Sequence, residues 1–118
     1  PEAIGYVNAH GTATDQGDIA ESMATHKVLG ERVPISSLKS FTGHTLGACG
    51  ALEAWLSIEM MREGWFAPTA NLERVDPRCA PLDYIVGGGR NLQTDLVMSN
   101  NFAFGGINTS LIFRRWNG

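Results

Sequence analysis

The strongest constraint on the fold is a run from about Ala48 to Arg62 that is apolar on nearly every side of a helix. Its large and small apolar residues are Leu52, Ala54, Trp55, Leu56, Ile58, Met60 and Met61. A helix without a polar face is buried all round, and one mixed sheet cannot cover all of its sides. We therefore expect residues 1–118 on their own to expose an apolar layer.

Length and charge favour a single domain. A chain of 118 residues can form one domain with a modest core. Its nine Lys and Arg residues are scattered and outnumbered by twelve Asp and Glu, which argues against a nucleic-acid partner. No long apolar run or signal-peptide pattern appears, so we expect no membrane partner and a cytoplasmic protein. The chain enters an apolar strand almost at once and lacks an initiator Met, so we expect a piece of a longer protein.

The chain alternates strand and helix patterns at first and ends in strands. We predict strands at 4–9, 33–39, 82–86, 96–99 and 109–114, and helices at 18–30 and 48–62. In the first helix, Asp18 and Glu21 form a capping box, while Ile19, Met23 and Val28 face inward. The order β-α-β-α-β-β-β predicts an α/β fold with a mixed sheet, parallel first and antiparallel at the end.

Three polar side chains are predicted to meet at one edge of this sheet. His10 ends the first strand, Lys39 ends the second, and His44 opens the next helix. Ligands of open α/β sheets bind beyond the carboxyl ends of the parallel strands. The two histidines with Asp15 or Asp18 could bind a metal, although Lys39 would place a positive charge among the ligands. Alternatively, the histidines and the lysine have no chemical role and the nearby glycines only end helices.

Three segments resemble a known family when taken together and in order. They are NAHGTATDQGDIAE at 8–21, SSLKSFTGHTLGACGALEA at 36–54 and SNNFAFGGINTSLIF at 99–113. They resemble the C-terminal half of the β-ketoacyl-acyl carrier protein synthases, the condensing enzymes of fatty acid and polyketide synthesis. The resemblance implies a thiolase-like fold, five-layered αβαβα in the complete protein, with residues 1–118 as its C-terminal domain.

The resemblance also implies a decarboxylative Claisen condensation. A cysteine carries the acyl chain, malonyl on its carrier protein loses carbon dioxide, and the enolate attacks the acyl thioester. His10 and His44 would donate hydrogen bonds to the malonyl thioester oxygen as negative charge develops there. Lys39 would disfavour protonation of the imidazoles, and Glu21 would hold the lysine.

Further roles follow from the same resemblance. The hydroxyls of Thr12 and Thr14 would bind the amides of the pantetheine arm. The alternative is that the two threonines only close a turn. Phe104 would be the gating phenylalanine whose backbone N–H completes the acyl oxyanion hole, next to two glycines that let it swing. Phe102 would pack beside the site.

A buried carboxylate is predicted on the apolar helix at Glu53, where a charge needs a partner. Members of the family hold a monovalent cation near matching positions, which here are Asn8, Glu53, Ser99 and Asn100. Alternatively, Glu53 accepts hydrogen bonds from the backbone or from Asn8. No other cofactor is implied.

The chain departs from the family pattern because it lacks the nucleophilic cysteine, which lies in the N-terminal half of these enzymes. Cys49 and Cys79 are interpreted as free structural thiols. Asp15-Gln16 replaces a pair that often contains proline, and Ile107 stands where threonine is common. The implied partners are acyl carrier protein and a second copy in a homodimer. The alternative is a non-catalytic partner like the chain-length factors, against which the retained histidines and lysine argue.

Overall fold

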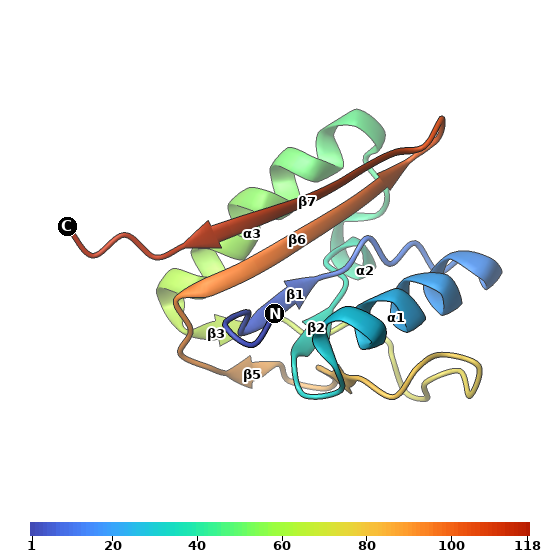
Figure 1. Cartoon of the computed structure of the whole chain (residues 1–118), viewed down its shortest axis with the longest axis horizontal. Coiled ribbons are helices and arrows are strands. Elements are labelled where there is room, and N and C mark those ends of the chain that lie inside the picture. The colour runs from blue at the N-terminus through green and yellow to red at the C-terminus, as the bar shows by residue number, and fades with distance from the viewer.

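The computed structural model describes all of residues 1–118 as an α/β structure built on a five-stranded mixed sheet (Figure 1). The strands, in spatial order, are β4 (Asp83–Tyr84), β2 (Pro34–Ser36), β1 (Tyr6–Asn8), β6 (Leu96–Ala103) and β7 (Ile107–Arg114). The first four are mutually parallel, and β7 runs antiparallel to β6. The predicted mixed sheet, parallel first and antiparallel at its end, is confirmed.

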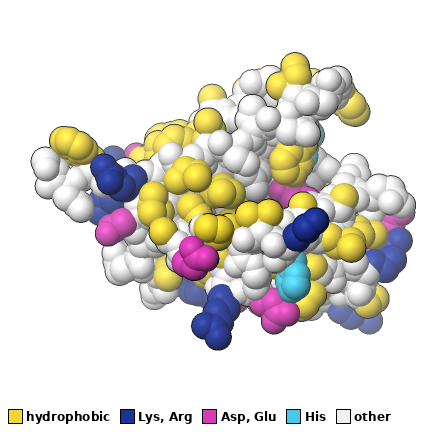
Figure 2. Space-filling view, viewed as in Figure 1, with side chains coloured by type: hydrophobic (Ala, Val, Ile, Leu, Met, Phe, Trp, Pro, Cys, Tyr) yellow, Lys and Arg dark blue, Asp and Glu magenta, His cyan; other side chains and the backbone are white.

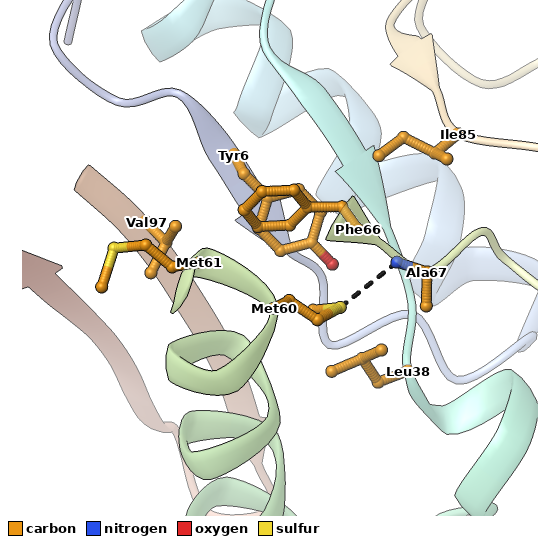
Figure 3. Close-up of a cluster of buried hydrophobic side chains, with 8 residues drawn as sticks. All are labelled: Tyr6, Leu38, Met60, Met61, Phe66, Ala67, Ile85 and Val97. Atoms are coloured by element: carbon orange, nitrogen blue, oxygen red, sulfur yellow. Dashed lines mark hydrogen bonds between the residues drawn. The ribbon is translucent and has the colours of Figure 1, made fainter. Parts of the chain in front are cut away.

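One helix lies on each face of the sheet. Neighbouring residues of β1 point to opposite sides, so this strand contacts both helices. Val7 packs in a cluster that includes Leu29 of helix α1 (Asp15–Leu29). Tyr6 packs on the other face in the larger cluster, which includes Met60 and Met61 of helix α3 (Cys49–Glu63). Figure 3 shows the Tyr6 ring against Phe66, with the ring centroids 4.3 Å apart. The central strand is therefore buried on both faces.

The β6–β7 hairpin is longer than predicted. The segment NNFAFGGIN was expected to be a loop, but β6 continues to Ala103 and β7 begins at Ile107. The polar asparagines suggested a loop, whereas continuous pairing with β7 satisfies the backbone of this segment. Gly105 and Gly106 have φ of 84° and 78°, values that a tight turn requires and that favour glycine.

The second strand is shorter than predicted, so Lys39 lies outside it. It ends at Ser36, and Lys39 begins a short helix, α2 (Lys39–Thr42). His44 lies in the loop that follows, ahead of the 3₁₀ turn η1 (Leu46–Ala48), and does not open a helix. Two strands that we did not predict, β3 (Trp65–Phe66) and β5 (Arg90–Asn91), pair antiparallel in a separate small sheet.

Helix α1 begins three residues earlier than predicted, and the capping box is absent. Thr14 is the N-cap and makes no side-chain cap bond. Asp18 Oδ1 instead accepts a hydrogen bond from the Ala13 N–H at 3.2 Å. The inward orientation of Met23 and Val28 is also wrong: they are 58% and 61% exposed, and the buried residues of α1 are Glu21, Ser22 and Thr25.

Helix α3 is covered on one side only. Its buried residues are Cys49, Glu53, Ser57, Met60 and Met61. Trp55 is 58% exposed on the other side. Figure 2 shows further hydrophobic side chains over the middle of β6 and β7 and at the tip of their hairpin. Ile112 of β7 is 55% exposed.

The whole-chain surface agrees with this uncovered side. The accessible surface is 7209 Å², against about 6,200 Å² for a typical folded monomer of this mass. Together with the exposed side chains of Trp55, Ile112 and Trp116, this agrees with the expected exposed apolar layer. No helix has the length and apolar character needed to cross a membrane.

Candidate functional site

The two histidines meet at the carboxyl edge of the sheet, as predicted. His10 follows β1, and His44 comes from the loop after α2. Their ring centroids are 5.4 Å apart, with the ring planes perpendicular. The Phe102 ring lies 5.5 Å from the His10 ring on another side, which agrees with its predicted place beside the site. Two imidazoles and an aromatic wall thus share one small region.

The backbone fixes the proton of neutral His44. The Leu46 N–H donates to His44 Nδ1 at 3.1 Å. A ring nitrogen that accepts a hydrogen bond carries no proton, so a neutral His44 is protonated at Nε2 and can donate from there. Leu46 has φ of 54°, an uncommon conformation for a leucine. This turn brings its N–H within hydrogen-bond distance of the His44 ring, which lies two residues earlier in the chain. The sequence analysis did not identify this contact.

His10 is disposed to stay neutral. Burial lowers the pKa of His10 most, and the positive charge of Lys39 lowers it further. Hydrogen bonding to Asn101 and the charge of Glu53 oppose these effects. Its Nδ1 atom is buried and has no hydrogen-bond partner. The predicted influence of Lys39 on an imidazole is therefore present at His10.

The predicted partner of Lys39 is wrong. Lys39 Nζ lies 2.6 Å from Glu53 Oε1, and the two side chains are 3% and 1% exposed. Glu53 was expected to accept from the backbone, from Asn8 or from a cation, and it pairs with the lysine instead. The spacing of 14 residues between Lys39 and Glu53 reflects the turn through α2 and η1 that brings α3 back beside the site.

Glu21 holds the backbone of the loop after β1 instead of the lysine. Its two carboxylate oxygens accept from the N–H groups of His10 and Gly11, each at 2.8 Å. Burial raises the pKa of Glu21, and these two backbone donors limit the rise. Gly11 has φ of 40°, and a Cβ there would lie 2.5 Å from the Ser37 Cβ, so only glycine fits. Glu21 is therefore a positioning residue for His10.

The hydroxyls of the two threonines lie side by side. Thr12 Oγ1 and Thr14 Oγ1 are 3.1 Å apart. Both line a cavity of about 780 Å³, and Lys39 and His44 line the same cavity. The hydroxyls and the charged edge of the site therefore face one space. The alternative metal site has no support in this arrangement, because the His, Cys, Asp and Glu residues form no group of three that could hold a metal ion.

Phe104 does not contact either histidine. Its side chain is fully exposed at the tip of the β6–β7 hairpin. The tip extends beyond the sheet, and nothing lies within 4 Å of a Cβ built on Gly105 or Gly106. Of the two phenylalanines in this segment, Phe102 is the one in contact with His10.

The four predicted cation ligands are only partly assembled. Asn8 Nδ2 donates to Ser99 Oγ at 3.1 Å, and Asn8 Oδ1 accepts from the Leu38 N–H at 3.3 Å. Asn100 follows Ser99 in β6, so its side chain points to the opposite face, where its Oδ1 accepts from the Ser110 hydroxyl at 2.6 Å. Glu53 Oε2 is buried without a partner. The side chains therefore offer a free oxygen at Glu53, not a cage of four ligands.

Both cysteines are free thiols. Cys49 is buried, and its Sγ lies 3.2 Å from Asn101 Oδ1. Cys79 is half-buried in the connection after β3, where it lines the cavity far along the chain from either histidine. Neither thiol makes a hydrogen bond to an imidazole, which agrees with a structural role.

Comparisons with known proteins cover nearly the whole chain. The family model "Beta-ketoacyl synthase, C-terminal domain" matches residues 1–73. The chain is 43% identical to 3-oxoacyl-[acyl-carrier-protein] synthase 2 of Synechocystis sp. over 98% of its residues, and spans 28% of that protein. It is 71% identical to a β-ketoacyl synthase crystal structure from Burkholderia phymatum, with a TM-score of 0.96, covering 98% of this chain and 28% of that one.

A second similar structure contains a partner. It is the AntDE:AntF complex, described as a type II polyketide synthase acyl-carrier protein with its ketosynthase bound to the hexaketide. The identity is 36% and the TM-score 0.91, with 98% of this chain and 29% of that one covered. The sheet, the helices and the sequence thus agree with one family over the C-terminal part of its members. This chain belongs to the β-ketoacyl synthase family and corresponds to its C-terminal domain.

Proposed function

We propose that this chain supplies the malonyl-decarboxylating side of a β-ketoacyl-acyl carrier protein synthase. In this proposal residues 1–118 are the C-terminal domain of a longer protein whose nucleophilic cysteine lies elsewhere. The observation that carries the proposal is the pair of imidazoles, 5.4 Å apart, at the carboxyl edge of the sheet. His10 has a lowered pKa, and the neutral form of His44 is protonated at Nε2.

The first step is the decarboxylation of malonyl thioester. The bond between the carboxylate and the α carbon breaks, carbon dioxide leaves, and the electron pair forms an enolate whose charge develops on the thioester oxygen. His10 and His44 each donate an N–H to that oxygen. One such donor contributes roughly 3 kcal/mol to the transition state. A neutral imidazole donates and then remains uncharged, so the site needs no proton from solvent.

The second step forms the new carbon–carbon bond. The enolate carbon attacks the acyl thioester carbonyl carried by the cysteine, the carbon–sulfur bond breaks, and the thiolate leaves. In the proposal the backbone N–H of Phe104 helps to bind the acyl oxyanion, and its ring gates the site. This role requires the hairpin tip to lie against the rest of the longer protein, because in residues 1–118 it is exposed.

The other polar residues support these steps. Lys39 keeps His10 neutral through its charge, and Glu53 compensates the buried lysine. Thr12 and Thr14 bind the amides of the pantetheine arm in the cavity that they line. A monovalent cation next to Glu53 Oε2 would neutralise the remaining buried carboxylate oxygen and would serve structure only.

The proposed substrate is delivered by acyl carrier protein, and the complete protein is proposed to be a homodimer. The similar ketosynthase in complex with its acyl-carrier protein supports the carrier as partner. The alternative is a non-catalytic partner of a condensing enzyme. The assembled histidine pair and the buried Lys39–Glu53 pair favour the enzyme, since a non-catalytic partner would not need them.

The experiment is a condensation assay on the full-length protein that contains this chain. The purified protein is incubated with acyl and malonyl carrier proteins, and the products are followed by mass spectrometry of the carrier. We expect a β-ketoacyl carrier, with the released carbon dioxide in equal amount. A protein that forms neither product alone, but restores condensation when mixed with a second ketosynthase subunit, would support the non-catalytic alternative instead.

A further inference from the structure

An arginine joins two segments that are far apart in the chain. Arg78 Nη2 lies 2.7 Å from Asp15 Oδ1 and 2.7 Å from Asp76 Oδ2. Asp15 is the first residue of α1, and Arg78 lies in the connection of residues 67–82 between β3 and β4, which Figure 1 shows running beneath α1. The same connection touches α1 again, since the Ala80 N–H donates to Ser22 Oγ at 3.0 Å.

This contact differs from an isolated surface ion pair, because a second carboxylate also binds the arginine. Exposed pairs usually contribute little, because two long side chains must be held in one geometry. Here Asp76 already holds the guanidinium, since it accepts from Arg78 Nε at 3.1 Å and from the Arg78 backbone N–H at 2.9 Å. The hydrogen bonds from Arg78 lower the pKa of Asp76 to about 2, so Asp76 stays charged near neutral pH. Asp76 thus orients the guanidinium of Arg78 toward Asp15.

Asp15 is directly connected to the hydroxyls proposed to bind substrate. Thr12 and Thr14 precede it, with Ala13 between them in the left-handed region at φ of 58°. A non-glycine residue in that region persists only where its surroundings hold it. Asp18 holds the Ala13 N–H from one side. The hydrogen bond between Asp15 and Arg78 holds the C-terminal end of this loop, directly after Thr14.

The link also forms part of the wall of the cavity. Thr12, Thr14, Asp15, Asp76 and Arg78 all line the same space of about 780 Å³. The histidines are fixed by other contacts, with Glu21 holding the backbone of His10 and Leu46 holding His44. A change at Arg78 should therefore disturb the threonine loop and leave the imidazoles in place.

We propose that Arg78 and Asp15 form a clasp that fixes the Thr12–Thr14 loop against the connection after β3, and thereby positions the pantetheine arm of the substrate. Arg78 is a positioning residue in this inference, which rests on the proposed function. The clasp affects only substrates that carry the arm.

The test uses the full-length protein and two substrates. Malonyl carrier protein has the pantetheine arm, and a malonyl thioester of a short thiol lacks it. Asp15→Asn/Arg78→Gln removes the clasp at unchanged net charge, and Asp15→Glu keeps a carboxylate for Arg78 to bind. We expect the first variant to raise the KM for malonyl carrier protein about two- to fivefold, the range of such exposed pairs. Its kcat and its decarboxylation of the short thioester stay as in the wild type, and the Asp15→Glu variant keeps a KM close to that of the wild type.

Glu31→Gln is the matched control, because it removes the exposed contact of Glu31 with His26 beyond the other end of α1. It should leave the KM unchanged. The clasp is refuted by an unchanged KM in the first variant, by an equal loss on the short thioester, or by an Asp15→Glu variant whose KM rises as much as that of the first variant. A wild type that decarboxylates neither substrate would instead refute the proposed function, and the inference with it.

Discussion

Replacing Lys39 by methionine tests the buried ion pair and its effect on His10 together. Lys39 and Glu53 are almost completely buried and 2.6 Å apart, and Glu53 Oε2 has no hydrogen bond of its own. Lys39→Met therefore leaves a buried carboxylate without its only partner. Breaking a buried pair in this way costs about 3–5 kcal/mol, whereas replacing both partners by apolar residues is often close to neutral.

The same change acts on catalysis through charge. The charge of Lys39 is the second cause, after burial, of the lowered pKa of His10, and the charge of Glu53 opposes it. Without Lys39 the pKa of His10 rises, so the imidazole becomes protonated at a higher pH than in the wild type. If only the neutral form decarboxylates malonyl thioester effectively, the acidic limb of the pH–rate profile moves to higher pH.

The assay combines urea unfolding of the full-length protein with the pH dependence of malonyl decarboxylation. Lys39→Met should lose about 3–5 kcal/mol of the free energy of unfolding, and its acidic limb should move upward. Lys39→Met/Glu53→Leu should regain most of the stability, and its limb should lie between the other two. A Lys39→Met variant with wild-type unfolding and an unmoved limb would refute both the cost of the unpaired carboxylate and the role of the lysine at His10.

Other changes test the acyl side of the site, the uncovered side of α3 and the two thiols. Phe104→Ala should reduce condensation more than malonyl decarboxylation, because its proposed role is on the acyl side; an equal fall in both half-reactions would make Phe104 purely structural. Residues 1–118 expressed alone should bind a hydrophobic dye strongly and have no condensing activity, whereas a monomer with a sharp unfolding transition and weak dye binding would contradict the uncovered side of α3. Incubation of the full-length protein with an acyl carrier thioester should leave Cys49 and Cys79 unmodified in mass spectrometry, and an acyl adduct on either would overturn their structural role.

The sequence predicted the fold best where hydrophobic periodicity and the order of the elements along the chain were sufficient. Alternating strand and helix patterns predicted the mixed sheet, and the rule that ligands bind at the carboxyl ends of strands predicted that His10 and His44 would meet. The uniform apolar character of residues 48–62 predicted a helix that this chain alone does not cover, and Trp55 is indeed exposed. These features depend on periodicity and chain order, which are local properties of the sequence.

The failures concern contacts set by tertiary structure. Glu21 and Glu53 are both acidic residues on helices, and nothing in their local sequence tells which of them meets Lys39. The answer depends on how α3 returns beside α2, and on the two free N–H groups of His10 and Gly11 that engage Glu21. The hairpin was underestimated because its asparagines resemble a loop, although β7 supplies partners for the whole of β6. Phe104 stands at a tip whose surroundings in residues 1–118 are solvent.

The most direct test of the central claim is the rate of malonyl decarboxylation in His10→Ala and His44→Ala variants of the full-length protein. Each variant loses one donor to the developing enolate oxygen, so the rate should fall by about two to three orders of magnitude. The measurement follows carbon dioxide release from malonyl carrier protein, with circular dichroism to show that each variant is folded. A folded variant of either kind that decarboxylates malonyl at close to the wild-type rate would contradict the claim that the two imidazoles stabilise this charge.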